Sequence, residues 1–493
     1  MPDLTPDWLA AWAMADPHAL ALEAASGTWT AGALDGAASA MAGRLAQLGL
    51  RPGAVVAALV EDDGPAVLLI HAARRLGAIL LPLNRRAAGP ELIAQVRAAT
   101  PGLLVHDGAN GARARELAAG TSVATAVVEG LLGGPGGAGA RSGPLPGVDL
   151  GAPATIVFTS GTTGRARGAR LTHGNHAASA DAWAAVLEPR PSDRWLACLP
   201  LFHVAGLAIV VRASRWRLAL AVLRRFETAD VAAHIASGSS HLSLVPTQLE
   251  QLTAAWGGRP VPPTLRAILL GGAPIPLATL AHARAAGLPV LTTYGMTETS
   301  SGVAVGGAEV ATLADPAALR PLPGAHVRVE DPDPADGVGQ ILVAGSMVFA
   351  GYLGDPAATD ERLADGWLRT GDLGSLDGDG LLRIADRRED LVISGGENVY
   401  PGEVEAVLRD HPAVVDAGVV GQADATWGSV PVAAVVVTPG ASVGDAELER
   451  HCRARLAGYK VPVRFHRLLD LPRNEAGKIL RRELRELLPK APP

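Results

Sequence analysis

Short apolar runs alternate with longer segments of helical periodicity through most of this 493-residue chain. Segments such as Gly32–Leu48 and Ala66–Leu76 have the spacing of amphipathic helices. The apolar runs between such segments are Ala54–Val60, Thr155–Phe158, Trp195–Leu199, Leu242–Val245, Ala267–Leu270 and Val290–Thr293. Strands that alternate with helices form parallel sheets, because each crossover helix covers a face of the sheet. The pattern predicts an α/β fold with largely parallel sheets.

The character of the sequence changes in its last third. Three runs there look like strands joined by tight turns: His326–Glu330, Gln340–Val343 and Leu381–Ala385. After Asp386 the pattern starts again, with predicted helices at Pro401–Arg409 and Asp445–Leu456 and apolar runs at Ala417–Val420 and Val430–Val437. This arrangement predicts a separate, small α+β domain at the carboxyl end.

A segment rich in glycine and proline, Gly130–Gly147, is predicted to be a surface linker. Within it, Gly134–Gly139 formally matches the glycine fingerprint of dinucleotide-binding proteins. No strand leads directly into this match, and Pro135 opposes the start of a helix, so we interpret it as linker.

Composition excludes several classes of protein. The formal charge of −6 is modest for this length and predicts neither nucleic-acid binding nor attraction to an anionic membrane. The two cysteines, Cys198 and Cys452, are far apart and suit a reducing compartment. Charged residues interrupt the longest apolar stretches, so no membrane span is expected. A cytoplasmic protein is predicted.

The run Thr159–Gly168 has the composition of a phosphate-binding loop. It follows the apolar segment Thr155–Phe158 directly and contains glycines, hydroxyl side chains and two arginines. Glycines let backbone N–H groups approach an anion closely, and hydroxyl and guanidinium groups add donors. The run is not a Walker A loop, because no Gly-Lys-Ser/Thr follows at the required spacing.

Four further islands follow this loop along the chain. They are Leu199–Gly206, Thr293–Thr299, Trp367–Leu373 with Asp386–Asp390 and Ser394–Pro401, and Leu471–Lys478. Together with the loop, and in the same order, they resemble the motifs of the adenylate-forming superfamily, which includes acyl- and aryl-CoA ligases, luciferases and the adenylation domains of peptide synthetases. The resemblance covers essentially the whole chain.

Within this superfamily, the chain is most similar to the o-succinylbenzoate–CoA ligases of menaquinone biosynthesis. It is short for a CoA ligase, and Tyr294–Ser301 resembles that subfamily's form of the motif. Arg212 ends the apolar run Gly206–Val211, where that subfamily places an arginine facing the aromatic carboxylate of the substrate.

The resemblance implies a large N-terminal domain of several subdomains at 1–385, with mostly parallel sheets flanked by helices and a distorted β-barrel. It implies a hinge at 386–390, best represented by Glu389, and a small, mobile α+β domain at 391–493. Hinges of this kind are a few element-terminal positions that absorb a large backbone change.

The activity implied is that of an AMP-forming acid–thiol ligase that uses ATP, Mg2+ and coenzyme A. The acid is first adenylated and then joined to the thiol of CoA, and the subfamily points to o-succinylbenzoate as the acid. Two anions meet in the first step, so the site needs positive charge and N–H donors. The expected partners are these small molecules, with no nucleic acid and no membrane span; a homo-oligomer is left open.

The resemblance also assigns a role to individual residues. Lys478 would bridge the substrate carboxylate and the nucleotide, Glu298 would help to hold Mg2+, and His203 would lie at the acyl pocket with Arg212. Tyr294 would stack on the adenine opposite Gly272-Ala273-Pro274, and Asp372 would accept hydrogen bonds from the ribose. The full nucleotide-binding set is Thr159, Ser160, Gly161, Thr162, Thr163, Gly164, Arg167, Gly272, Ala273, Pro274, Tyr294, Gly295, Thr297, Asp372 and Arg387.

For the second step, the resemblance implies that the small domain rotates. Rotation would withdraw Lys478 and present the loop Gly395-Gly396-Glu397 to the CoA tunnel.

The chain departs from the family pattern in its phosphate loop, which in the family usually carries a lysine where this chain has Arg167. Arginine keeps the charge and donates in a fork, but it is bulkier, so phosphate binding is expected to survive while the closing motion of the loop is in question.

Other interpretations of these residues, and of the function of the chain, stay open from the sequence. An arginine that ends an apolar strand, as Arg212 is expected to do, can extend its side chain to solvent. Trp427 is expected to pack, and Tyr459-Lys460-Val461-Pro462 is expected mainly to form a turn before a strand, although the resemblance also implies that this region can lie near CoA. The alternatives in function are a ligase for a fatty, benzoic or cinnamic-type acid, an enzyme that loads a carrier protein, and an inactive nucleotide-binding protein.

Overall fold

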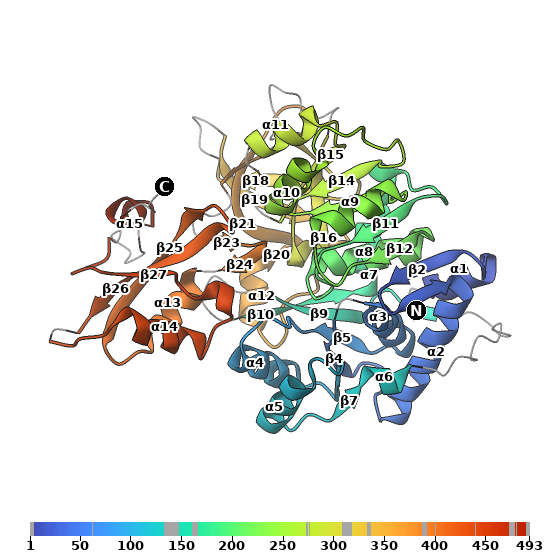
Figure 1. Cartoon of the computed structure of the whole chain (residues 1–493), viewed down its shortest axis with the longest axis horizontal. Helices are drawn as coiled ribbons and strands as arrows, with labels where there is room; N and C mark the ends of the chain where they lie inside the picture. Colours follow the sequence, from blue (N-terminus) through green and yellow to red (C-terminus); the bar gives the residue numbers. More distant parts are fainter. Residues whose placement is uncertain are drawn as a thin grey trace.

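The computed structural model describes most of the chain. The described residues are 4–61, 63–132, 147–159, 166–272, 275, 277–307, 318–332, 337–386, 392–399, 401–438, 440–472, 479 and 481–489. They form a large domain, whose last described strand ends at Asp386, and a small domain, whose first described strand begins at Val392 (Figure 1).

The first sheet of the large domain has the strand order β10-β9-β5-β4-β6-β7. Its strands are β4 (Val55–Leu59), β5 (Ile79–Pro82), β6 (Leu103–His106), β7 (Thr125–Val127), β9 (Pro153–Thr159) and β10 (Arg167–Thr172). All neighbours run parallel except β9 and β10, which are antiparallel. The predicted phosphate loop therefore connects two paired strands, and Thr159 lies opposite Arg167 in the register.

The second sheet has a parallel centre in the order β15-β14-β13-β11-β12-β2, with β3 antiparallel at its edge. These strands are β2 (Leu20–Ala24), β3 (Gly27–Thr30), β11 (Arg194–Ala197), β12 (Ala219–Val222), β13 (His241–Leu244), β14 (Ala267–Leu270) and β15 (Val290–Met296). The predicted strand at Ala267–Leu270 is confirmed, and all four of its residues are buried, as expected for a strand covered on both faces.

Antiparallel strands extend this sheet beyond β15 in the order β16-β17-β22-β21-β19-β18. They are β16 (Ser301–Gly306), β17 (Ala318–Pro321), β18 (His326–Glu330), β19 (Gly339–Ala344), β21 (Trp367–Leu376) and β22 (Leu382–Asp386), and the short β20 (Leu363–Ala364) pairs with β21. This is the region where a distorted barrel was expected, and the pairings of the described strands form an open extension of the sheet there.

Helices cover both sheets of the large domain. They are α1 (Trp8–Ala15), α2 (Ala31–Gln47), α3 (Gly64–Leu76), α4 (Gly89–Ala99), α5 (Gly111–Thr121), α6 (Val128–Leu131), α7 (His173–Leu187), α8 (Val204–Trp216), α9 (Thr228–Ala236), α10 (Pro246–Trp256), α11 (Leu277–Ala285), α12 (Pro356–Arg362) and the 3-10 helix η1 (Thr297–Thr299). One hydrophobic cluster joins α2, α3, α7 and α8 to strands of both sheets, so these helices form a shared central layer. Helices α4 and α5 cover the far face of the first sheet, and α9–α11 that of the second (Figure 1).

Local sequence explains where the helices begin and end. Helix α3 begins after the N-cap Asp63, whose side chain accepts from the N–H of Gly64, and Pro65 occupies its first turn. It ends at Gly77, which has φ +70°, a conformation that favours glycine. The predicted helix Ala66–Leu76 is thus confirmed, with a start two residues earlier than expected.

The small domain contains an antiparallel sheet, with strand order β24-β23-β26-β25, and β27 parallel to β26. Its strands are β23 (Val392–Ser394), β24 (Glu397–Val399), β25 (Val414–Asp424), β26 (Gly428–Val437) and β27 (Arg464–Arg467). Its helices are α13 (Pro401–Arg409), α14 (Asp445–Arg453), α15 (Arg481–Leu487) and the 3-10 helix η2 (Gly458–Lys460). Helices α13 and α14 cover one face of the sheet and α15 the other, which is the α+β arrangement predicted from sequence.

Some predictions fall partly or wholly outside the described residues. In the predicted linker, Gly130 and Leu131 belong to helix α6 and Gly147 to the short strand β8 (Gly147–Asp149), which pairs with β1 (Leu4–Pro6); the match Gly134–Gly139 is not among the described residues. Asp386 ends β22, whereas 387–391, including Arg387 and Glu389, lie outside the described part, so the hinge and the exact domain limits stay predictions. None of the helices in the described ranges is long and apolar enough to cross a membrane.

Candidate active site

A cavity of about 790 Å3 lies between the carboxyl ends of the parallel strands of the second sheet and the small domain. Ligands of open α/β sheets bind at this edge, because the loops that follow the strands converge there. The cavity brings together many of the residues singled out in the sequence: Thr159, Arg167, His203, Arg212, Gly272, Gly295, Thr297, Glu298, Asp372, Gly395, Gly396 and Glu397.

Other predicted site residues lie outside the described residues. These are Ser160, Gly161, Thr162, Thr163, Gly164, Ala273, Pro274, Arg387, Glu389 and Lys478. Their roles stay predictions.

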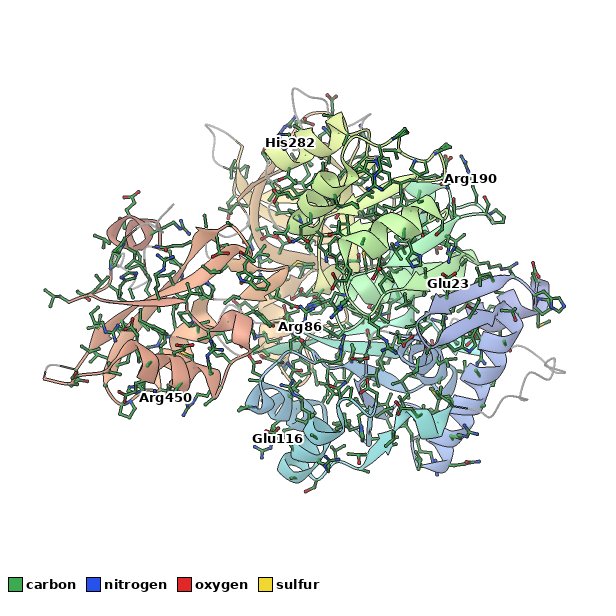
Figure 2. All side chains as sticks on the ribbon, viewed as in Figure 1. Glu23, Arg86, Glu116, Arg190, His282 and Arg450 are labelled. Atoms are coloured by element: carbon green, nitrogen blue, oxygen red, sulfur yellow. The ribbon has the colours of Figure 1, made fainter. Side chains whose placement is uncertain are left out.

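Glu397 connects the small domain to the large one. Its Oε2 lies 3.0 Å from Nε2 of His203, and its Oε1 accepts a hydrogen bond of 2.7 Å from the guanidinium of Arg86. Figure 2 shows Arg86 at the junction of the two domains. Burial alone would raise the pKa of Glu397, but the bond to His203 and the charges of His203 and Arg86 hold that pKa below its ordinary value. The carboxylate is therefore a fixed negative charge at the wall of the cavity.

The turn before Glu397 requires its two glycines. Ser394 pairs with Glu397 across a two-residue turn, and Gly395 and Gly396 have φ of +58° and +82°. Two successive positive φ angles define a type I′ hairpin turn, which favours glycine at both positions. A Cβ on Gly395 would also lie only 2.6 Å from Cε3 of Trp427. The glycines thus position Glu397 through the backbone.

Arg212 is buried at the other end of the cavity. It lies inside helix α8 and is only 3% exposed, so the expectation that it ends a strand, with a side chain free to reach solvent, is wrong. The apolar run before it is helical because it packs α8 into the central helical layer. The guanidinium donates to Oγ of Ser301 over 3.2 Å, and its Cζ lies 5.1 Å and 5.6 Å from the ring centroids of Trp183 and Trp195.

The guanidinium of Arg212 has no carboxylate partner among the described residues, and its Nε has no hydrogen-bond partner there. Burial lowers its pKa to about 9, so it still carries a positive charge at neutral pH. A buried charge without a counter-ion is costly, and protein structures rarely retain one without a use for it. The arrangement is therefore suited to bind an anionic group that enters the cavity.

Glu298 is placed to contribute a carboxylate to the cavity. It lies in η1 after β15, is 6% exposed, and accepts a hydrogen bond of 2.7 Å from the hydroxyl of Tyr352. Burial, and then the charge of Glu298, raise the pKa of Tyr352, so this hydroxyl stays a donor. Mg2+ is often held by one or two carboxylates together with phosphate oxygens, and a single oriented carboxylate beside the end of the predicted phosphate loop fits that pattern.

Tyr294 and Asp372 are held to each other. The hydroxyl of Tyr294 donates to Oδ2 of Asp372 over 2.8 Å, and the side chain of Asp372 faces the cavity. Tyr294 is 3% exposed and does not line the cavity, whereas its neighbour Gly295 does. The structure therefore assigns the ring of Tyr294 a place behind the cavity wall, and adenine stacking by this residue stays a prediction.

Arg167, the residue that replaces the usual lysine, lies between two side chains of the large domain. Its Nε is 3.5 Å from Oδ2 of Asp355, and its Cζ is 5.6 Å from the ring centroid of Tyr352. Because Tyr352 also contacts Glu298, Arg167 and Glu298 are joined through one aromatic ring. The guanidinium lines the cavity from this position.

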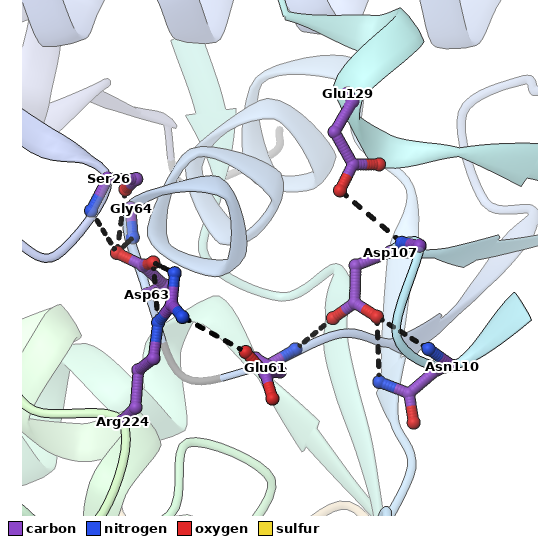
Figure 3. A network of polar contacts seen from close by, with 9 residues as sticks. Ser26, Glu61, Asp63, Gly64, Asp107, Asn110, Glu129 and Arg224 are labelled. Atoms are coloured by element: carbon purple, nitrogen blue, oxygen red, sulfur yellow. Dashed lines mark hydrogen bonds and ion pairs between the residues drawn. The ribbon is translucent and has the colours of Figure 1, made fainter.

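A network of polar contacts connects the cavity wall to the first sheet (Figure 3). Arg224, in the loop after β12, donates two hydrogen bonds to Oδ2 of Asp63 at 3.0 and 2.6 Å, and Asp63 also caps α3. Burial would raise the pKa of Asp63, but bonds from Ser26 and Arg224 lower it. The contact ties loops of both sheets together beside the cavity.

Sequence reasoning missed several residues of this site. Arg86 and Tyr352 gave no local signal, because each acts through a partner distant in the chain. Trp427, expected to pack, is 53% exposed and lines the cavity. Lys460, expected in a turn, is buried at the domain boundary. For Lys460 the resemblance gave one signal, because it implies that the segment Tyr459-Lys460-Val461-Pro462 can lie near CoA, and Tyr459 does line the cavity.

Comparison with known proteins gives the class of this chain. The AMP-binding enzyme family matches residues 9–353, and the C-terminal domain of AMP-binding enzymes matches residues 403–478. The chain belongs to the AMP-binding enzyme family. It is 40% identical to the 2-succinylbenzoate–CoA ligase of Geobacillus kaustophilus and 38% identical to that of Bacillus cytotoxicus, in each case over 98% of both chains.

Solved structures of o-succinylbenzoate CoA synthetase from Bacillus subtilis are similar over the whole chain. A double mutant bound with the product analogue OSB-NCoA superimposes with a TM-score of 0.90 at 36% identity, covering 98% of this chain and 99% of that one. The same enzyme with the acyl-adenylate intermediate OSB-AMP gives a TM-score of 0.73 at 35% identity, covering 99% of both chains.

Replacement of Arg212 provides a test of its buried, uncompensated charge. We expect Arg212→Met to leave the free energy of unfolding unchanged or to raise it by about 1 kcal/mol, because an apolar side chain replaces a charge that has no counter-ion among the described residues. Urea denaturation of the unliganded protein measures this.

Arg75→Met is the matched control for this measurement. Arg75 is also buried, but it lies 3.1 Å from Asp7 and 2.5 Å from Asp35, so its loss should cost about 3–5 kcal/mol. A comparable loss in the free energy of unfolding for Arg212→Met would show that Arg212 stabilises the fold and is not a ligand-binding charge.

Proposed function

We propose that this chain is an ATP-dependent ligase that adenylates 2-succinylbenzoate (o-succinylbenzoate) and then transfers the acyl group to coenzyme A. The observation that carries the proposal is the buried charge of Arg212, which faces a cavity that also contains Glu298, Asp372 and Glu397. Succinylbenzoate has two carboxylates: one can react while the other pairs with the guanidinium. The names of the 40% and 38% identical relatives support this acid.

In the first half-reaction, a carboxylate oxygen attacks the α-phosphorus of ATP, the bond to the β-phosphate oxygen breaks, and pyrophosphate leaves. The reaction joins two anions, so the groups around it must be donors and cations. We assign the β- and γ-phosphates to Thr159–Gly168 with Arg167, the ribose to Asp372, and the bridging charge to Lys478. Thr159, Arg167 and Asp372 line one cavity, which supports their part of this assignment.

Glu298 is the residue that we assign to Mg2+, which neutralises phosphate charge and holds the phosphate oxygens in place when bound. Its buried carboxylate is oriented by the hydrogen bond that Oε1 accepts from Tyr352. The structure of the Bacillus subtilis enzyme in complex with ATP and magnesium ion, at 36% identity, supports the requirement for both.

In the second half-reaction, the thiol sulfur of CoA attacks the acyl carbonyl, AMP leaves, and the thiol proton is lost. The described arrangement supports this step, because Glu397 of the small domain reaches His203 and Arg86 of the large domain. The TM-scores support the same orientation. The Bacillus subtilis double mutant with a CoA product analogue bound superimposes on this chain with a TM-score of 0.90, whereas the enzyme with the acyl-adenylate bound gives 0.73 at nearly equal identity and coverage. We infer that the structure represents the orientation for thioester formation; self-association of the chain stays a prediction.

A panel of acids tests this function. We expect wild-type protein to release pyrophosphate with 2-succinylbenzoate but only slowly with benzoate or a fatty acid, and to form a thioester only when CoA is present. Arg212→Met should lower kcat/KM for 2-succinylbenzoate about 100-fold or more, since truncation of one partner of a buried charge pair costs roughly 3–5 kcal/mol. Benzoate should be little affected. Equal losses for both acids would favour a ligase for a monocarboxylate.

Lys478 is predicted to act in adenylation only. Lys478→Ala should slow pyrophosphate release by several orders of magnitude, because the bridging charge is lost where two anions meet. Thioester formation from synthetic acyl-adenylate should be largely intact, since rotation would withdraw this residue in the second step. Pyrophosphate release and single-turnover thioester formation measure the two steps separately, and equal losses in both would refute this division.

A further inference from the structure

An ammonium group bridges the two domains away from the cavity. Lys460 ends η2 of the small domain, and its side chain is 8% exposed. Its Nζ lies 2.7 Å from Oε1 of Glu91, on α4 of the large domain, and 2.7 Å from Oε1 of Glu403, on α13 of the small domain. The ion pair between Lys460 and Glu91 therefore forms only while the domains are docked as described.

A contact within the large domain orients Glu91. It lies in the first turn of α4, and its Oε2 accepts a hydrogen bond of 2.8 Å from the N–H of Ala88. A carboxylate at a helix N-terminus is stabilised by the helix dipole, and this bond fixes its direction. Its other oxygen is thus presented as a preformed acceptor to Lys460.

The cluster of Glu91, Glu403 and Lys460 contains two acidic groups and one basic group. Two carboxylates, with side chains 13% and 12% exposed, share a single ammonium. Burial raises the pKa of Glu403 to about 7, since the repulsion of Glu91 adds to burial and Lys460 only partly offsets them. Glu403 is therefore partly protonated near neutral pH, which brings the net charge of the cluster closer to zero.

The cluster is continuous with the predicted CoA side of the site. Tyr459, next to Lys460, lines the cavity, and its hydroxyl accepts a hydrogen bond of 3.3 Å from Nδ2 of Asn84 in the large domain. Gly402, next to Glu403, lines the cavity as well. The position of η2 and α13 against α4 therefore fixes how the small domain faces the cavity.

We propose that Lys460 is a positioning residue for thioester formation, which bridges Glu91 and Glu403 to hold the small domain in the orientation described. It touches neither substrate in this role and acts through Glu397 and the cavity wall. The proposal rests on the proposed two-step function and adds a residue that serves the second step alone.

Half-reaction kinetics of variants at Lys460 and Glu91 test this role. Lys460→Gln and Glu91→Gln should each slow single-turnover thioester formation from synthetic acyl-adenylate at least tenfold. Both should leave pyrophosphate release within twofold of wild type, because adenylation uses another orientation of the small domain. Glu91→Gln lies in the large domain, so it tests the contact even where Lys460→Gln impairs folding of the small domain.

Rescue and a matched control complete the test. Lys460→Arg should recover most of the rate, and the charge swap Glu91→Lys with Lys460→Glu should be faster in thioester formation than either single change. Glu116→Gln, an exposed acid of the neighbouring helix α5 (Figure 2), should change neither step.

Three results would overturn the proposal: equal slowing of both steps, a charge swap no better than its parents, or variants that match wild type. A wild-type protein that forms no CoA thioester at all would instead contradict the proposed function. The two failures are therefore distinguishable.

Discussion

The carboxylate of Glu397, buried between His203 and Arg86, is the contact on which the described arrangement depends. It is the point where the small domain enters the active-site cavity, and its charge is maintained because two cationic or hydrogen-bonding side chains outweigh the cost of burial. The glycines of the preceding turn hold it there through the backbone, and a side chain at Gly395 would strike Trp427. The ion pair of Lys460 and Glu91 acts at the same boundary. Together, these contacts define the orientation of the two domains in this structure.

The second constraint is the buried positive charge of Arg212, which has no carboxylate partner among the described residues. Arg212 is enclosed by Trp183, Trp195 and Ser301, which tolerate a guanidinium but do not neutralise it. Such a site is unfavourable in the free protein and favourable once an anion enters, so binding energy is available only to an acid with a second negative group. In the proposed function the two constraints act on different steps: we assign selection of the acid to Arg212 and preparation of the thiol attack to Glu397.

Much of the fold followed from periodicity, because the apolar runs and the helix caps are local. Strands such as Ala267–Leu270 and the helix Pro401–Arg409 were located to the residue. Arg212 was placed wrongly, since a short apolar run does not distinguish a buried strand from a helix in a central layer. The motif residues could be predicted only through their resemblance to a family. The contacts of Lys460 with Glu91 and of Arg86 with Glu397 could not be predicted, because the partners in each pair are hundreds of positions apart in the chain and meet only where the two domains dock.

The rate of thioester formation in a Glu397→Gln variant tests the central claim most directly. The amide keeps the shape of the side chain but loses the charge that holds it between His203 and Arg86. We expect rapid-quench measurements with synthetic acyl-adenylate and CoA to show a rate of thioester formation that is about tenfold lower or more, equivalent to at least ~1.4 kcal/mol. Pyrophosphate release from ATP and acid should be unchanged. Unchanged thioester formation, or an equal loss in both steps, would contradict the claim that this carboxylate docks the small domain for the second step.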